Sequence, residues 1–179
     1  MNVQIKNLDM ASEVQVYDNF LSKHELDEIN SSLFSDKSVF NWYFSRSKMR
    51  DGVKEDGITQ FIHFLYVDNQ IVSDFFGLFS NTIFNKLNIL SFIRVKLNLQ
   101  IRDSMIRKSQ LHRDVEVISQ EQKTGIFYLN SNDGYTFFEN GEKIKSVENR
   151  MVIFPSSLYH AGTTHTDAQY RCVVNMNWI

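Results

Sequence analysis

The chain has 179 residues and a formal charge of −2, with 42% apolar, 22% charged and 13% aromatic residues. This composition excludes an intrinsically disordered chain, because fifteen phenylalanines supply ample apolar surface for a core. The slightly acidic balance leaves a nucleic-acid partner or an anionic membrane surface unsupported. A single cysteine, Cys172, excludes an internal disulfide and a thiolate zinc cage.

The chain carries few signals of segmentation or targeting. Seven glycines and one proline form no linker and no repeat, so we expect a single domain over residues 1–179. Its N-terminus lacks the apolar core of a signal peptide, and its apolar stretches fall short of the roughly 20 residues that span a membrane. We therefore expect a cytoplasmic protein with no membrane contact; no pattern predicts its oligomeric state.

The first 90 residues favour a strand and two helices. A strand is expected at 14–16, and a helix over about 22–34, because Ser22 and Glu25 have the spacing of a capping box. A second helix is expected from about Ser73 to Leu87. The polar stretch between them, Ser35 to Gly57, is expected to be a loop with some strand around Val39 to Phe44. The apolar positions with helical spacing are Leu26, Ile29 and Leu33 in the first helix, and Phe76, Phe79, Ile83 and Leu87 in the second.

After residue 92 the pattern changes to alternation, which is typical of strands. In residues 93–102, five apolar side chains alternate with Arg94, Lys96, Asn98, Gln100 and Arg102. Further strands are expected at His112 to Val117, Gly125 to Asn130, Thr136 to Phe138, Glu142 to Val147, Arg150 to Phe154 and Tyr170 to Trp178. This order predicts a mainly β fold, an antiparallel sandwich or barrel with the helices on one outer face. The polar face of the 93–102 strand then lines the mouth, where Asn98 and Gln100 are candidate pocket residues.

One cluster of residue types indicates metal chemistry. His112 and Asp114 are two apart on an expected strand, so their side chains share a face and can bind one ion. His160, 46 residues beyond Asp114, supplies a third ligand. Two imidazoles and one carboxylate form the facial triad of non-haem Fe(II) oxygenases, which leaves coordination positions open for a co-substrate and dioxygen. His165 is the competing third ligand, although its segment GTTHTD favours a solvated turn.

Eleven residues past His160, Arg171 heads an expected strand and offers the planar fork that a carboxylate accepts. Asn175 shares its face of the strand and is a candidate pocket donor. The rival arginine, Arg150, immediately precedes an apolar strand, a position typical of an exposed charge.

These pieces resemble the 2-oxoglutarate/Fe(II)-dependent dioxygenases, in particular the compact prolyl-4-hydroxylase-like branch and its phage or bacterial versions. The motifs follow the family's order: His112-x-Asp114, the strand IFYLN with Tyr128, the loop NDGYTFF, the segment MVIFP, His160 and Arg171. The resemblance implies a double-stranded β-helix (a cupin-like jelly-roll), with Fe(II) on His112, Asp114 and His160. It also implies that 2-oxoglutarate chelates the iron and that its distal carboxylate pairs with Arg171 and Tyr128. If the protein is phage-encoded, its location is the host-cell cytoplasm.

The sequence departs from that branch at two places. Arg102 stands where related prolyl hydroxylases carry a tyrosine, and Asp133-Gly134 stands where they carry Gly-Gly. Asp114 favours hydroxylation, because relatives that halogenate replace this carboxylate with a small residue.

The resemblance implies a dioxygenase that hydroxylates a C–H bond of a peptidyl or small-molecule substrate, consuming dioxygen and releasing succinate and carbon dioxide. Two alternatives stay open: a jelly-roll module that binds a metal or a small acid as a sensor or structural unit, and an enzyme with another metal and no oxidation. The loop with Trp42, Tyr43, Phe44, Arg46, Lys48 and Arg50 is expected to border the mouth, in a mixture suited to an anionic or aromatic ligand.

Overall fold

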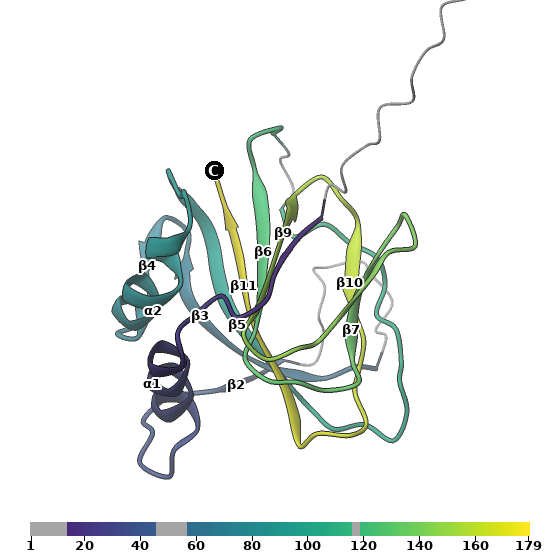
Figure 1. Cartoon of the computed structure of the whole chain (residues 1–179), viewed down its shortest axis with the longest axis horizontal. Coiled ribbons are helices and arrows are strands. Elements are labelled where there is room, and N and C mark those ends of the chain that lie inside the picture. The colour runs from purple at the N-terminus through teal and green to yellow at the C-terminus, as the bar shows by residue number, and fades with distance from the viewer. Residues whose placement is uncertain (1–13, 46–56, 116–118) are drawn as a thin grey trace, which may run out of the picture.

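The computed structural model describes residues 14–45, 57–115 and 119–179. Two antiparallel sheets face each other, and the helices cover the outer face of the larger sheet (Figure 1). The strands of the large sheet are β1 (Gln15–Tyr17), β2 (Tyr43–Ser45), β3 (Gln60–Val67), β4 (Gln70–Ile71), β5 (Phe92–Ile101), β6 (Lys123–Tyr128), β9 (Arg150–Pro155) and β11 (Tyr170–Trp178). Their order is β1-β9-β6-β11-β5-β3-β2, with β4 paired to β3. The small sheet has the order β10 (His160–Gly162), β7 (Tyr135–Phe138), β8 (Lys143–Lys145).

Strand alternation separates two apolar cores from one polar pocket. On β5, Val95 and Leu97 pack under the helices, whereas Lys96, Asn98 and Gln100 point between the sheets. The outer core also takes Cys172, Val174 and Met176 from β11, and the inner core takes Ile126, Tyr128, Phe138, Val152, Phe154 and Val173. The expected layout, a jelly-roll sandwich with helices on one outer face, is confirmed.

Helix α1 (Lys23–Phe34) confirms the first helix prediction. Ser22 accepts from the backbone N–H of Glu25, and the Glu25 carboxylate accepts from the Ser22 N–H at 2.8 Å, which completes the capping box. The buried positions are Leu26, Ile29 and Leu33, as the spacing predicted.

The second expected helix is shorter than predicted. It consists of α2 (Phe76–Thr82) followed by a 3₁₀ turn, η1 (Phe84–Lys86). Thr82 donates its hydroxyl back to the Leu78 carbonyl at 2.8 Å, and Asn85 donates to the Asn81 carbonyl. Such side chains compete with the backbone hydrogen bonds of a helix, which explains why this segment tightens instead of continuing.

Two strand predictions need correction, and one strand was not predicted. The residues 112–115 do not form the expected strand at His112 to Val117; only His112 makes an isolated bridge, and 116–118 lie outside the described residues. The strand expected at Val39 to Phe44 is the short β2. The sequence interpretation missed β3 altogether, because its run QFIHFLYV is apolar on both faces and has no alternation to reveal it.

Within these described ranges, no helix is long and apolar enough to cross a membrane.

Candidate metal centre

The two histidines come together through the backbone. His112 and His160 form an isolated antiparallel bridge in which each N–H donates to the other's carbonyl at 3.0 Å. Residues that pair in this way project their side chains to the same face. The ring centroids therefore lie 5.1 Å apart, with His160 on β10 and His112 on the segment that follows β5.

Asp114 completes the cluster. One carboxylate oxygen, Oδ2, lies 3.4 Å from His160 Nε2, and the other, Oδ1, lies 3.8 Å from His112 Nε2. Arg94 on β5 pairs with Oδ1 at 2.7 Å, and Asn175 on β11 donates to Oδ2 at 2.9 Å. Burial would raise the pKa of Asp114, but the His160 contact and the charges of Arg94 and Lys96 outweigh it and hold the pKa well below its ordinary value. The carboxylate is therefore ionised at neutral pH.

The other ring nitrogen of each histidine faces a backbone carbonyl. His112 Nδ1 lies 3.0 Å from the Gln110 oxygen, and His160 Nδ1 lies 3.2 Å from the Leu158 oxygen. A carbonyl only accepts, so each Nδ1 carries a proton, and each Nε2 faces Asp114, where its lone pair could ligate a metal. Burial also lowers the pKa of His112, which favours the neutral imidazole. Phe154 packs edge-on against the His160 ring at 4.7 Å and limits its rotation.

These residues fit a divalent metal. Among the described residues, the ligand atoms of His112, Asp114 and His160 form a group that could hold a metal ion, all within 4.8 Å of one another. Imidazoles whose Nδ1 is held by a carbonyl and an ionised carboxylate held by hydrogen bonds are the arrangement that metal sites use. The donor set, two nitrogens and one carboxylate, suits Fe(II) with open coordination positions.

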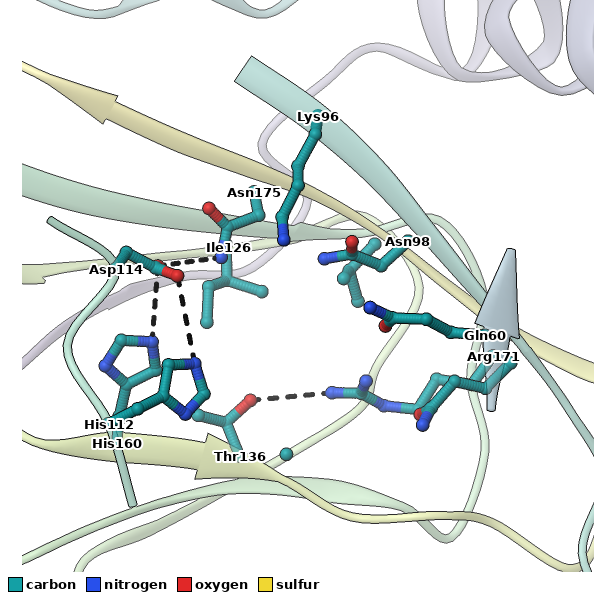
Figure 2. A pocket seen from close by; sticks show the side chains of 13 residues that line it. Gln60, Lys96, Asn98, His112, Asp114, Ile126, Thr136, His160, Arg171 and Asn175 are labelled. Atoms are coloured by element: carbon teal, nitrogen blue, oxygen red, sulfur yellow. Dashed lines mark hydrogen bonds and ion pairs between the residues drawn. The ribbon is translucent and has the colours of Figure 1, made fainter. Parts of the chain in front are cut away.

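Arg171 lies at the opposite end of the same pocket (Figure 2). Its Nε donates to the Ser146 hydroxyl at 2.9 Å, its guanidinium stacks over the Tyr128 ring at 5.6 Å, and one terminal nitrogen lies 3.5 Å from Thr136 Oγ1. Burial lowers the pKa of Arg171. No carboxylate pairs with Arg171 anywhere in the described ranges, and Asp167 instead accepts from the Asp133 backbone N–H. A buried cation without an anion partner is costly, which suggests an anionic ligand.

Two glycines lie beside this arginine, and Gly134 leaves it room. A Cβ at Gly134 would come within 3.2 Å of Arg171 Cδ and 3.1 Å of the Thr164 carbonyl, so the turn before β7 favours glycine at this position. Gly162 on β10 lies next to the guanidinium, but a Cβ there would stand 3.5 Å from the nearest nitrogen, which is an ordinary contact. The preceding residue, Asp133, binds the Thr166 hydroxyl and N–H, so the departure from Gly-Gly anchors the neighbouring loop.

The structure brings most of the candidate residues to one cavity between the sheets. Of the sequence-predicted residues, those that line it are Asn98, Gln100, His112, Asp114, His160, Arg171 and Asn175. Tyr128 lies behind this surface and donates its hydroxyl to Thr136 Oγ1 at 2.7 Å. Among the hydroxyl groups near Arg171, that of Thr136 belongs to a residue of the cavity lining, and contact of Tyr128 with a co-substrate stays a prediction.

Sequence reasoning missed three polar lining residues or gave them little weight: Gln60, Lys96 and Thr136. Gln60 lies on the unpredicted strand β3. The alternation of β5 assigns Lys96 to the same face as Asn98, so that signal was already present in the sequence.

The alternatives to the candidate residues lie elsewhere. His165 is fully buried, so the expectation of a solvated turn is wrong, and it does not line the cavity. Arg150 forms a bidentate pair with Asp18 at 2.6 and 2.9 Å, so it is engaged between β9 and the end of β1 and is not a free surface charge. Arg46, Lys48 and Arg50 of the expected mouth loop lie outside the described residues.

Solved structures share this fold. An oxidoreductase of the 2OG-Fe(II) oxygenase family from Burkholderia pseudomallei aligns with a TM-score of 0.65 and 12% identity over 93% of this chain and 85% of that one. A prolyl hydroxylase from Trichoplax adhaerens, in complex with a hypoxia-inducible-factor peptide fragment, aligns at 0.63 and 12% over 93% and 83%. The viral collagen prolyl hydroxylase of Paramecium bursaria Chlorella virus-1, in a 2-oxoglutarate complex, aligns at 0.54 and 15% over 94% and 96%.

The expected likeness to 2-oxoglutarate/Fe(II) oxygenases, including prolyl hydroxylases, is confirmed for the fold. No protein-family model and no curated protein matches the sequence.

Proposed function

We propose that the protein is an Fe(II)- and 2-oxoglutarate-dependent dioxygenase that hydroxylates a small-molecule or peptidyl substrate. The observation that carries this proposal is the pairing, in one cavity, of a His-Asp-His cluster with a buried arginine that has no carboxylate partner among the described residues. A module that bound only a metal would not need the arginine, and a module that bound only an acid would not need the cluster.

His112, Asp114 and His160 would hold Fe(II), which would supply the site where dioxygen, the oxidant, converts 2-oxoglutarate to succinate and carbon dioxide and hydroxylates the substrate. Arg94 and Asn175 hold the Asp114 carboxylate in one orientation. The Gln110 and Leu158 carbonyls keep both imidazoles in the tautomer that presents Nε2.

Arg171 would bind the distal carboxylate of the co-substrate together with the Thr136 hydroxyl. The Tyr128 ring packs against the Arg171 guanidinium. The Tyr128 hydroxyl donates to Thr136 Oγ1, so the hydroxyl proton of Thr136 is available to the ligand. The amides of Asn98, Gln100 and Asn175 line the same surface. Asn98 Oδ1 is buried and has no hydrogen-bond partner in the part of the chain that the structure describes; 2-oxoglutarate carries only acceptors, so the group of Asn98 that would bind it is the amide nitrogen.

The primary substrate needs a separate place near the metal. Asp114 and Arg94 also line a second, wider hollow with Phe92, Gln122 and Ile179. We assign the substrate to this second hollow, because its lining includes the metal ligand Asp114 but not Arg171.

The proposal is tested by adding Fe(II) and 2-oxoglutarate to the protein without oxygen and recording the visible spectrum. A charge-transfer band that needs both additions, and that is lost in His160→Ala, is the expected result. If 2-oxoglutarate neither produces the band nor binds when Fe(II) is present, the proposal fails, and a metal- or acid-binding module takes its place.

A further inference from the structure

A lysine faces the cavity from the middle of the large sheet. Lys96 lies on β5 directly opposite Asn175 of β11, and its side chain points between the sheets beside Asn98. In Figure 2 its ammonium group extends into the space between the metal cluster and Asn98.

The ammonium group has no partner in the described structure. Within residues 14–45, 57–115 and 119–179, no carboxylate forms an ion pair with Lys96 and no hydrogen bond engages it. Asp114 is nearby, but its two oxygens already bind Arg94 and Asn175. Burial and the charge of Arg94 lower the pKa of Lys96 to about 8, opposed by Asp114. A group with this pKa still carries its proton in roughly nine molecules of ten at pH 7.

Lys96 belongs to the metal end of the cavity and Arg171 to the other. The lysine charge acts on His112 and on Asp114, whereas the groups that act on Arg171 are Tyr128 and Cys172. Along the sheet, Arg171 lies opposite Gln100, four residues from Lys96 on β5. Strands rise about 3.3 Å per residue, so the two stems are about 13 Å apart and the long side chains approach the cavity from its two ends.

We propose that Lys96 binds the metal-proximal carboxylate of 2-oxoglutarate, so that Lys96 and Arg171 clamp the two ends of one dicarboxylate. The inference rests on the proposed function. Arg94 and Asp114 pair with each other. Among the described residues, Lys96 and Arg171 are therefore the two cations of the lining that have no carboxylate partner. A bound dianion would neutralise both positive charges.

The test compares two ligands that differ only at the distal end. 2-Oxopentanoate has the keto-acid end of 2-oxoglutarate but lacks the distal carboxylate. Dissociation constants of both ligands are measured by calorimetry without oxygen, with the protein saturated with Fe(II). Wild type, Lys96→Met and Arg171→Met are compared, with Lys145→Met as a control that removes an exposed lysine on β8. Circular dichroism and melting curves establish that each variant is folded.

Lys96→Met is expected to weaken both ligands by a similar factor of about 10- to 100-fold, because both share the carboxylate that Lys96 binds. Arg171→Met is expected to weaken 2-oxoglutarate alone and to abolish the preference of wild type for it. Lys145→Met should match wild type.

Two results would overturn the role of Lys96 while the proposed function stands: unchanged affinities for both ligands in Lys96→Met, or a loss confined to 2-oxoglutarate. If wild type saturated with Fe(II) binds neither ligand, the proposed function itself fails, and the inference fails with it.

Discussion

Asn175 offers a sharp test of how the metal cluster is built. Its amide donates to Asp114 Oδ2 at 2.9 Å, while Arg94 holds the other oxygen at 2.7 Å. Removing one hydrogen bond to a ligand carboxylate typically lowers metal affinity 10- to 100-fold. Because Arg94 still orients the carboxylate in Asn175→Ala, we expect the lower part of that range, about 10- to 30-fold, or about 1.4 to 2 kcal/mol.

The assay is a titration with Mn(II), a stable substitute for Fe(II), followed by electron paramagnetic resonance of the free ion. The matched control is Asn177→Ala, two residues along the same face of β11. Asn177 is buried, contacts Arg94 at 3.0 Å and donates to Thr124, but it does not bond to Asp114. Both variants lose a buried amide, so a loss of affinity specific to Asn175→Ala isolates the contact with Asp114. Equal Mn(II) affinities for Asn175→Ala and wild type would refute the reasoning.

Three further predictions test the site and the fold. His160→Ala should lose Mn(II) binding in the same titration while circular dichroism shows an intact fold, and His165→Ala should keep it; binding retained by the first variant would disprove the ligand set. Glu25→Gln should lower the free energy of unfolding by about 0.5 to 1 kcal/mol at pH 7, because Gln still accepts from the Ser22 N–H but loses the charge that strengthens this bond and pairs with Lys86 at 2.9 Å. Hydrogen bonds from Lys86 and Ser22 lower the Glu25 pKa from 4.5 to about 2, so urea denaturation should show this difference in full above about pH 5 and see it fade as the pH falls toward 2. Asn149→Ala should cost about 2 to 4 kcal/mol in the same assay, because its buried amide bonds both the N–H and the carbonyl of Leu21 at 2.8 Å; a cost no greater than that of the exposed-turn variant Asn140→Ala would contradict it.

The features that depend on local pattern could be predicted from the sequence alone. Alternation on β5 and β11 assigned each side chain to the helix side or the pocket side, because a strand turns successive residues to opposite faces. The capping box of α1 depends on residues three apart, and the His112-x-Asp114 spacing on residues two apart, so both were visible without a structure.

The features that depend on contacts between distant segments could be recognised only in the folded protein. Gln60 enters the pocket from β3, a strand whose two apolar faces hide its period. His112 occupies its position through a bridge to His160 and not through a strand of its own.

The partners of the candidate site residues also belong to distant segments. Asp114 meets Arg94 and Asn175 from two neighbouring strands, and Tyr128 contacts the cavity lining through Thr136 and Arg171. A residue's own spacing says which face it occupies, but its partners depend on which strands become neighbours and in what register, and that is settled only when the whole sheet closes around the pocket.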